Sequence, residues 1–331
     1  MTTKPNIGPD KAGTRLTSVE YNRDVLQSAR YLQEVLAGTN ADKVLATAIA
    51  NLPQANILVN GGLEHWDRGA GPFTSSGASA PAAIGWVGLA NGGGSLAVSK
   101  DTANADLSGA SASVTCTSGA GTTEMSLSQA LEEYAQINGR MITLTVRVRS
   151  GVANAVRLAI EETQGGGVLL TYGNYHSGGG GYETLSVSKA IRTGNTRIRV
   201  MVAFAVTVST PTYVDNAMLV YGAQTVDFIP QQAGDSQRRV ERLYQVTRMT
   251  FTQYAGSPTA VAVPLPYRSA TGGTPTITLA ANGVGTDLNP SGSFATPTAT
   301  NVTSYGALYQ VIPATPADTR ANRDATIEWT P

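Results

Sequence analysis

Residues 56–66 of this chain read Asn-Ile-Leu-Val-Asn-Gly-Gly-Leu-Glu-His-Trp, and the organisation of the rest can be worked out from them. Residues 57–59 are apolar, a pair of glycines follows at positions 61 and 62, and a second run ends at Trp66. Apolar runs separated by glycine are typical of a strand, a tight turn and a second strand. The stretch therefore marks the start of a β domain.

Composition agrees with a β protein. Charged residues make up 14% of the chain and aromatic residues 6%, whereas 36 residues are glycine. Low charge and many turn-forming residues favour short strands joined by tight turns. The 23 basic residues balance the 23 acidic ones, so no basic face that would bind nucleic acid is evident. A neutral, weakly charged surface favours association, as in an oligomer within a larger assembly.

The first residues and the apolar runs bear on localisation. The N-terminus, Met-Thr-Thr-Lys-Pro-Asn, has no apolar signal core, and no run approaches the ~18–20 apolar residues of a membrane span. We therefore expect a protein made in the cytoplasm, without membrane insertion. The single cysteine, Cys116, lies in an alternating run and is expected to be a small buried residue without a disulfide partner.

An N-terminal helix is predicted before the β domain. Thr17 and Glu20 have the spacing of a capping box, and Gly38 is a suitable stop. Apolar residues at intervals of four, three and four form a narrow seam, which consists of Val25, Ala29, Leu32 and Leu36. A helix this short needs a partner. Either it lies on its own β domain, or it packs in a trimeric bundle or docks on another protein.

Alternation of apolar and polar residues predicts the strands of the β domain. Residues 139–150 alternate, with Ile142, Leu144, Val146 and Val148 on one face, which indicates a half-buried strand. Further strands are predicted at 85–98, 112–117, 125–131, 156–162, 168–175, 184–188, 197–205 and 212–220. Residues 67–81, rich in Gly, Ser, Ala and Pro, are expected to form a surface loop.

The tail, residues 245–331, holds five alternating runs separated by Pro, Gly, Asn and Thr. They lie at 249–251, 260–265, 274–280, 307–311 and 325–329. Runs of this kind can make a small sandwich or a trimeric β tip, and the sequence leaves the topology open.

Several motifs occur in the order of a known family. Besides the opening stretch, there are Ser128-Gln129-Ala130-Leu131, the strand from Gly139 to Ser150, and Tyr213 to Leu219 followed by Gly222. In these respects the chain resembles the jelly-roll carbohydrate-binding-like modules of bacteriophage tail-fibre proteins. The resemblance covers residues 56–233. Phe228-Ile229-Pro230 and residues 238–244 are similar to the short crossover helix of phage fibres, without its usual cysteine.

The resemblance implies a mainly β protein of three parts. Residues 1–55 would be a helical arm for oligomerisation and attachment, residues 56–233 a jelly-roll β-sandwich, and residues 234–331 a small C-terminal β domain that forms a tip or completes a trimer.

The resemblance also implies a structural calcium. In related modules, the acidic residue of the opening motif and the aspartate of the closing strand coordinate it; here these are Glu64 and Asp215. First and last strands of a jelly roll are neighbours, so oxygen ligands from both could hold a hard cation. The alternative is a surface glutamate and a turn-capping aspartate with no metal.

A sugar site needs exposed aromatic rings beside polar side chains. The candidates flank the glycine run at 178–181 and are Tyr172, Tyr175, His176 and Tyr182. The alternative is that these side chains pack the sandwich. Trp66 and Trp86 are expected in the core, and Trp329 at a contact between subunits or at the tip.

No catalytic constellation stands out. His65 and His176 have no nearby nucleophile in the sequence, and adjacent carboxylates on a strand, as at Glu161 and Glu162, point to opposite faces. No repeat period of the kind found in β-helical enzymes appears along the chain.

The predicted function is that of a structural and adhesive phage virion protein of a tail fibre or baseplate. As a homotrimer it would bind a host-surface glycan without turnover, and residues 1–55 would contact other virion proteins. Multivalency would strengthen weak contacts. One alternative is a head-fibre, capsid-decorating or adaptor protein that binds no sugar. The other is a polysaccharide depolymerase.

Overall fold

The computed structural model describes residues 55–253, 261–266, 275–279, 298–300, 306–311 and 319–328, together with Ala29 and Val302. The chain divides into two compact units, Met1–Gln54 and Ala55–Pro331. In the first unit Ala29 is helical and exposed. The other residues of the predicted seam, Val25, Leu32 and Leu36, lie outside the described residues.

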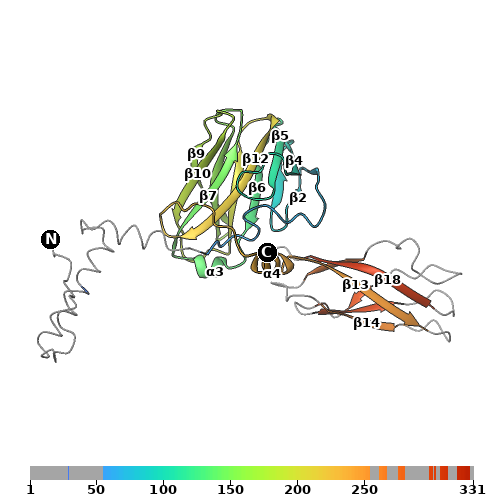
Figure 1. Cartoon of the computed structure of the whole chain (residues 1–331). Helices are drawn as coiled ribbons and strands as arrows, with labels where there is room; N and C mark the ends of the chain where they lie inside the picture. The colour runs from blue at the N-terminus through green and yellow to red at the C-terminus, as the bar shows by residue number, and fades with distance from the viewer. Residues whose placement is uncertain are drawn as a thin grey trace, which may run out of the picture. The chain divides into compact units, whose positions relative to one another are not determined.

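The second unit contains a β-sandwich of two six-stranded antiparallel sheets (Figure 1). Sheet A has the order β1-β4-β5-β12-β7-β10. Its strands are β1 (Phe73–Ser76), β4 (Ser95–Asp101), β5 (Ser111–Thr117), β12 (Val208–Tyr221), β7 (Met141–Arg149) and β10 (Tyr182–Ala190). The chain passes repeatedly from one sheet to the other, as in a jelly roll.

Sheet B has the order β2-β3-β6-β11-β8-β9. Its strands are β2 (Ser79–Pro81), β3 (Val87–Ala90), β6 (Met125–Ala130), β11 (Arg197–Phe204), β8 (Val156–Gln164) and β9 (Gly167–Tyr175). The fold is thus mainly β, as predicted.

Side-chain alternation explains how the two sheets pack. In β7, Ile142, Leu144, Val146 and Val148 are at most 1% exposed and contribute to the core, whereas Arg147 and Arg149 lie on the outer face. This confirms the period-two prediction for the strand. Trp66 and Trp86 are in the core as predicted, and Cys116 is buried and free. Burial raises the pKa of its thiol.

Two strand predictions were wrong at the start of the sandwich. The single strand predicted at 85–98 is two strands, β3 and β4, which belong to different sheets. Residues 67–81, expected as a loop, contain β1 and β2, one at an edge of each sheet. An edge strand needs only one partner, so small residues suffice there. Ser75 adds a bond between the two sheets, because its hydroxyl oxygen accepts the Ala90 N–H at 2.8 Å.

The opening stretch joins the closing strand β12. Ile57 N donates to Leu219 O at 2.9 Å, and the Asn56 side-chain amide donates to Ala217 O at 2.8 Å. The chain turns at Asn60, whose φ is 53°, and then at Gly61. A Cβ at Gly61 would lie 2.3 Å from the Ala217 carbonyl oxygen, so the close approach requires glycine.

Two helices accompany the sandwich, the four-residue α3 (Tyr134–Ile137) and α4 (Ala233–Glu241). The helix predicted at 238–244 therefore begins and ends earlier. Val240 and Leu243 pack with Val59 and Ile84 in a second apolar cluster, which fixes α4 against the opening stretch. No helix within the described residues is long and apolar enough to span a membrane.

The tail forms two three-stranded antiparallel sheets, with orders β13-β18-β15 and β14-β17-β16. All five predicted runs overlap strands, and β16 was not predicted. The strands are β13 (Tyr244–Gln253), β14 (Val261–Pro266), β15 (Thr276–Leu279), β16 (Thr298–Thr300), β17 (Gly306–Val311) and β18 (Thr319–Glu328). Trp329 lies outside the described residues.

Candidate ligand-binding site

The structure separates the four residues predicted to bind sugar. Tyr172 and Tyr175 lie on β9 in sheet B, and Tyr182 lies on β10 in sheet A. His176 follows β9 and is completely buried. The four side chains therefore do not form one cluster.

His176 has a structural position, which corrects its assignment as a ligand-binding residue. Its Nδ1 accepts the Gly178 N–H at 2.9 Å, so the ring proton lies on Nε2. Nε2 then donates to Val148 O, 3.1 Å away. Because the ring is 0% exposed and both nitrogens are used, His176 holds the end of β9 against β7 and cannot contact a ligand.

Tyr182 is half-buried on the outer face of sheet A. Its hydroxyl donates to Asn104 O, in the loop of residues 102–110 between β4 and β5. Burial raises the pKa of this hydroxyl, and the charges of Asp215 and Asp106 raise it further. The loop covers the ring, so Tyr182 is part of the packing of sheet A.

Tyr172 and Tyr175 share one face because the β8–β9 ladder contains an irregularity. Residues three apart on a regular strand point to opposite faces. Here Tyr172 is opposite Ala159 while Tyr175 is opposite Arg157, so the register shifts between them. The Arg157 guanidinium carbon lies 3.5 Å from the Tyr172 ring centroid and 4.6 Å from that of Tyr175.

A groove lies on the outer face of sheet B beside these rings. Its volume is about 190 Å³. One wall comes from the β5–β6 loop, the other from β8 and β9, and Met201 of β11, 2% exposed, lies between them. Tyr172 and Leu170 on the rim are 43% and 37% exposed. The lining residues of most interest are Thr123, Glu124, Arg157, Leu170, Tyr172 and Met201.

An ion-pair network holds the charges next to the groove. Arg199 Nη2 lies 2.8 Å from Glu124 Oε1 and 2.6 Å from Glu161 Oε2, and Arg197 lies 2.7 Å from the other oxygen of Glu161. Burial opposes ionisation of Glu161, but the hydrogen bonds and charges of Arg199 and Arg197 outweigh it and lower the pKa. Both carboxylates are therefore partnered by arginine.

The predicted opposite orientation of Glu161 and Glu162 is confirmed. Glu161 joins this network on the outer face, whereas Glu162, also buried, accepts hydrogen bonds from Arg192 and Asn195. The two carboxylates thus have different partners and do not form an acid/base couple.

Glu64 and Asp215, the predicted calcium ligands, contact the same loop of residues 102–110. Glu64 is exposed and accepts the Gly109 N–H at 3.0 Å. Asp215 is buried and accepts the N–H of Asp106 at 2.7 Å and the hydroxyl of Ser108. Burial raises the pKa of the Asp215 carboxyl despite these bonds.

A cation at this loop would find a buried free oxygen, because Asn216 Oδ1 has no hydrogen-bond partner among the described residues. No group of three or more His, Cys, Asp or Glu side chains placed to hold a metal occurs within the described residues. Protein donors already bind both carboxylates. Calcium binding through Glu64 and Asp215 stays a prediction.

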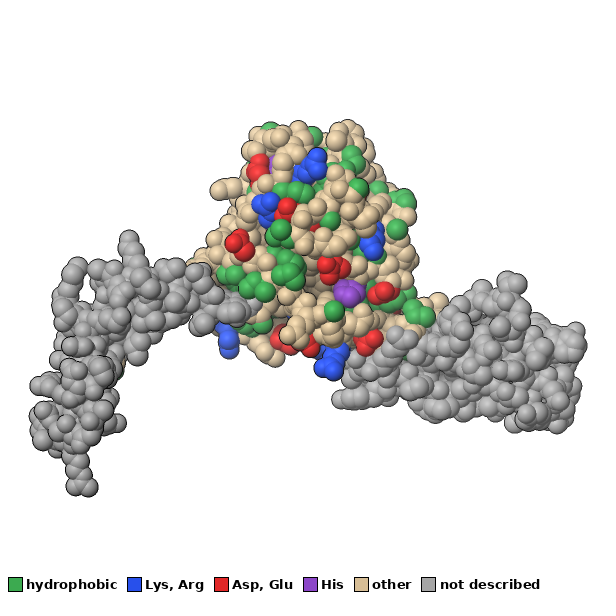
Figure 2. All heavy atoms as spheres, viewed as in Figure 1, with side chains coloured by type: hydrophobic (Ala, Val, Ile, Leu, Met, Phe, Trp, Pro, Cys, Tyr) green, Lys and Arg blue, Asp and Glu red, His purple; other side chains and the backbone are tan. Residues whose placement is uncertain are grey.

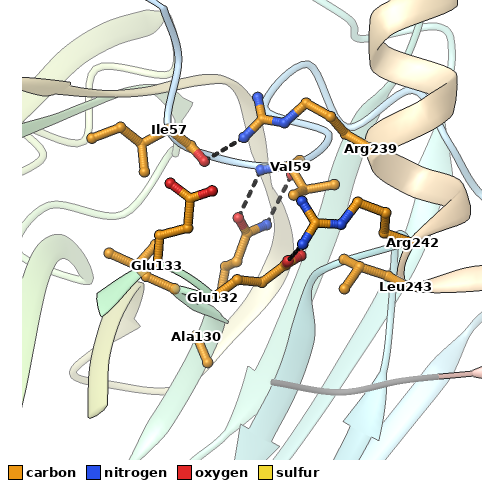
Figure 3. A pocket seen from close by; sticks show the side chains of 10 residues that line it. Ile57, Val59, Ala130, Glu132, Glu133, Arg239, Arg242 and Leu243 are labelled. Atoms are coloured by element: carbon orange, nitrogen blue, oxygen red, sulfur yellow. Dashed lines mark hydrogen bonds and ion pairs between the residues drawn. The ribbon is translucent and has the colours of Figure 1, made fainter. Parts of the chain in front are cut away.

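A second, smaller pocket of about 50 Å³ lies between α4, the opening stretch and the end of β6 (Figure 3). Arg239 donates to Asn56 O at 2.8 Å and to Ile57 O at 2.6 Å, and Arg242 pairs with Glu132 at 2.9 Å. Burial lowers the pKa of Arg239 and raises that of Glu132. Both arginines are thus bound to groups of the sandwich, and these contacts hold α4 against it.

Sequence reasoning missed Arg157 and Glu124. Arg157 could have been placed by alternation, since it falls on the polar face of the predicted strand 156–162. Glu124 sits just before β6, where no local pattern marks it. On the face drawn in Figure 2, side chains of both charges are interspersed, without a large patch of either sign.

No family model matches the sequence, and no curated relative does. The similar solved structures include the enzymatically active domain of bacteriophage CBA120 tailspike protein 4, at 12% identity and a TM-score of 0.34. That match covers 50% of this chain and 21% of the tailspike chain, so the chain spans about a fifth of its length.

Carbohydrate-binding modules are also among the similar structures. A xylan-binding domain from CBM 22 has 15% identity and a TM-score of 0.35, covering 43% of this chain and 90% of that one. A family 11 module from Clostridium thermocellum, solved with a β-1,3-1,4-mixed-linked tetrasaccharide, has 15% identity and a TM-score of 0.32, covering 41% and 89%. At these values the likeness assigns no ligand to the present chain.

Proposed function

We propose that this protein is a structural and adhesive component of a bacteriophage virion, and that the groove on sheet B binds a host-surface glycan without turnover. The observation that carries the proposal is the exposed ring of Tyr172 beside a groove of about 190 Å³ that also presents a guanidinium group. Sugar rings pack on aromatic faces, and their hydroxyls need polar partners nearby.

The exposure of the tyrosines favours binding over a purely structural adaptor. In an adaptor, these rings would pack the sandwich and be buried. Instead Tyr172 and Tyr175 lie on one outer face, and Leu170 next to them is 37% exposed. An exposed apolar rim around a polar groove is typical of a binding surface.

The carboxylates around the groove support binding without turnover. A glycosidase uses a carboxylic acid with a raised pKa and a second carboxylate across the bond that is cleaved. Here Glu124 and Glu161 share Arg199, and the pKa of Glu161 is lowered. The lowered pKa of Glu161 is the opposite of what a general acid needs, and Glu124 is held by Arg199.

The virion part of the proposal comes from the resemblance and from the predicted seam in residues 1–55. We propose that this arm anchors a homotrimer to other virion proteins, in a tail fibre or baseplate, or in a head fibre built from the same parts. Three grooves per trimer would turn weak contacts into firm attachment. Deletion of residues 1–55 should abolish attachment to particles while the β-sandwich still folds. Retained attachment would contradict the anchoring role.

Glycan binding can be tested by calorimetry with polysaccharides from the host surface. Tyr172→Ala should weaken binding about tenfold, which corresponds to about 1.4 kcal/mol. Tyr221→Ala is the matched control, because Tyr221 is also exposed and also lies under an arginine, Arg140, but belongs to sheet A. If the intact protein binds no host polysaccharide, the adhesive function is wrong. Release of reducing ends would show turnover.

A further inference from the structure

The guanidinium of Arg157 has no acceptor among the described residues. It lies over two tyrosine rings, and it makes no hydrogen bond or ion pair with any described residue. A guanidinium carries five N–H donors in a fixed plane, and a protein normally provides acceptors for several of them. Arg157 therefore presents its donors to the groove.

Four other arginines on the outer faces are engaged by the chain itself. Arg197 and Arg199 share Glu161 on the same sheet. On sheet A, Arg147 pairs with Asp106 at 2.7 Å, and Arg149 donates to Asn104 Oδ1 at 3.1 Å. Each of these four arginines uses an acceptor that Arg157 lacks. Arg140, which lies over Tyr221, also has no acceptor among the described residues, but Arg157 is the one that lines the groove.

The remaining charge of the groove is already neutralised. Glu124 is the acidic residue that lines it, and Arg199 holds this carboxylate at 2.8 Å. An incoming anion would therefore meet one unpaired cation and no unpaired carboxylate among the lining residues. The local charge of the groove is positive although that of the whole chain is zero.

We propose that the groove selects an acidic glycan, with a sugar carboxylate bound by Arg157 through two parallel N–H···O bonds. This inference rests on the proposed function and adds the class of sugar. The tyrosine rings fix the plane of the guanidinium, so little freedom is lost when its edge engages a carboxylate. The exposed part of the Tyr172 ring is left for the body of the sugar. A hydroxyl of a neutral sugar cannot make the paired, charge-assisted contact.

The test compares three trisaccharides by titration calorimetry with the full-length protein. They are trigalacturonate, its methyl ester, which is neutral, and a sulfated galactose trisaccharide. The acid should bind at least about tenfold more tightly than the ester, as expected for charge-assisted hydrogen bonds. Its affinity should fall as salt is raised, whereas that of the ester should not.

Variants assign the preference to Arg157. Arg157→Gln should abolish the preference for the acid, and Arg157→Lys, which keeps the charge but not the planar fork, should retain only part of it. Arg140→Gln is the matched control, since it removes a cation that also lies over a tyrosine, 5.1 Å from its centroid, away from the groove. This control should leave the preference unchanged.

The outcomes separate the two proposals. Equal binding of acid and ester, with Tyr172→Ala still weakening both, would overturn the acidic-glycan inference and leave the adhesive function standing. Tighter binding of the sulfated sugar than of trigalacturonate would overturn the assignment to a carboxylate. Failure of every trisaccharide and of all host polysaccharides to bind would overturn both proposals.

Discussion

Arginine side chains lie over tyrosine rings on the outer faces of both sheets, but the hydrogen-bond partners of these arginines differ. On sheet A the guanidinium carbons of Arg147 and Arg149 lie 5.6 Å and 5.5 Å from the ring centroids of Tyr182 and Tyr213. On sheet B the corresponding distance between Arg157 and Tyr172 is 3.5 Å. The arginines of sheet A are hydrogen-bonded to the loop of residues 102–110, and Arg157 is not.

The loop that crosses one face therefore decides which face can bind. Residues 102–110 provide acceptors for both arginines and for Tyr182, and Asp215 in turn accepts hydrogen bonds from the loop. On sheet B the outer face has a groove instead, bounded by the shorter β5–β6 loop. The arginines of the Arg147–Tyr182 and Arg149–Tyr213 pairs are thus satisfied internally on sheet A, whereas the donors of Arg157 on sheet B are available to a ligand.

The largest expected effect comes from releasing the loop of residues 102–110 from the outer face of sheet A. Asp215→Ala leaves the Asp106 and Asn216 N–H groups and the Ser108 hydroxyl without their buried acceptor. We expect a loss of about 3 kcal/mol in the free energy of unfolding, measured by denaturant titration. Glu64→Ala is the control, since Glu64 is exposed and holds the loop by one bond, and it should cost about 0.5 kcal/mol or less. Equal losses for both would show that burial of Asp215 is irrelevant.

Calcium would sharpen the comparison by fixing the same loop. If Glu64, Asp215 and the free Asn216 Oδ1 bind it, calcium at ten times its Kd should stabilise the fold by about 1.4 kcal/mol. The melting temperature should then fall on addition of chelator in the intact protein but not in Asp215→Ala. A melting temperature indifferent to calcium and chelator would favour the alternative without metal.

Tyr182 and Tyr172 should differ in what they contribute. Tyr182 should contribute to stability and Tyr172 to glycan binding. Tyr182→Phe removes the bond to Asn104 O and should cost about 1 kcal/mol of stability without changing glycan affinity. Tyr172→Phe keeps the ring and removes a hydroxyl with no partner within the described residues, so its effect on stability should be within about 0.5 kcal/mol. Thermal unfolding and calorimetry of both variants provide the comparison. A stable Tyr182→Phe variant that has lost binding would place the site on sheet A.

The smallest expected effect is a pH dependence of opposite sign on the two faces. The pKa of Glu161 is lowered from an ordinary value of 4.5, so its contribution is complete above that value and is lost as pH falls through the folded pKa. The pKa of Asp215 is raised from its ordinary value of 3.8, so the folded protein binds a proton at this carboxyl more readily than the unfolded chain does. The contribution of Asp215 to the free energy of unfolding therefore falls as pH rises through the folded pKa.

Melting temperatures between about pH 3 and pH 7 would reveal these signs. The difference between the intact protein and Glu161→Gln should shrink on acidification, whereas the difference from Asp215→Ala should grow. Parallel curves for the two variants would contradict the pKa shifts.

Much of the fold follows from local patterns. Local patterns located the strands from β5 to β12, most clearly β7, whose apolar residues lie in the core while Arg147 and Arg149 lie on the outer face. Alternation failed at β1 and β2, which lie at the sheet edges and in which Phe73 is the one large side chain that packs against the core. It also merged β3 and β4, since a turn with Gly92 and Gly93 divides an otherwise continuous pattern.

The site was only partly predictable, for a geometric reason. The Gly165-Gly166 turn of the β8–β9 hairpin fixes the register that places Ala159 opposite Tyr172. The irregularity that brings Tyr175 opposite Arg157 has no local signature. The burial of His176 likewise depends on the position of Val148, a residue from another strand. Tertiary contacts, not local sequence, decide which tyrosines are free.

The hydrogen bonds that Arg239 donates to the Asn56 and Ile57 carbonyl oxygens have a mechanical consequence. The chain enters the sandwich at Asn56 and leaves through α4, and Arg239 Nη1 is 2.8 Å from Asn56 O. Tension applied to the chain at these two positions would be carried by the short bridge between the opening stretch and α4. The opening stretch is also hydrogen-bonded to β12 of sheet A, so this strand shares the load, whereas the groove lies on sheet B. Pulling on the proposed virion protein at these two positions would therefore load α4 and β12 before the groove on sheet B.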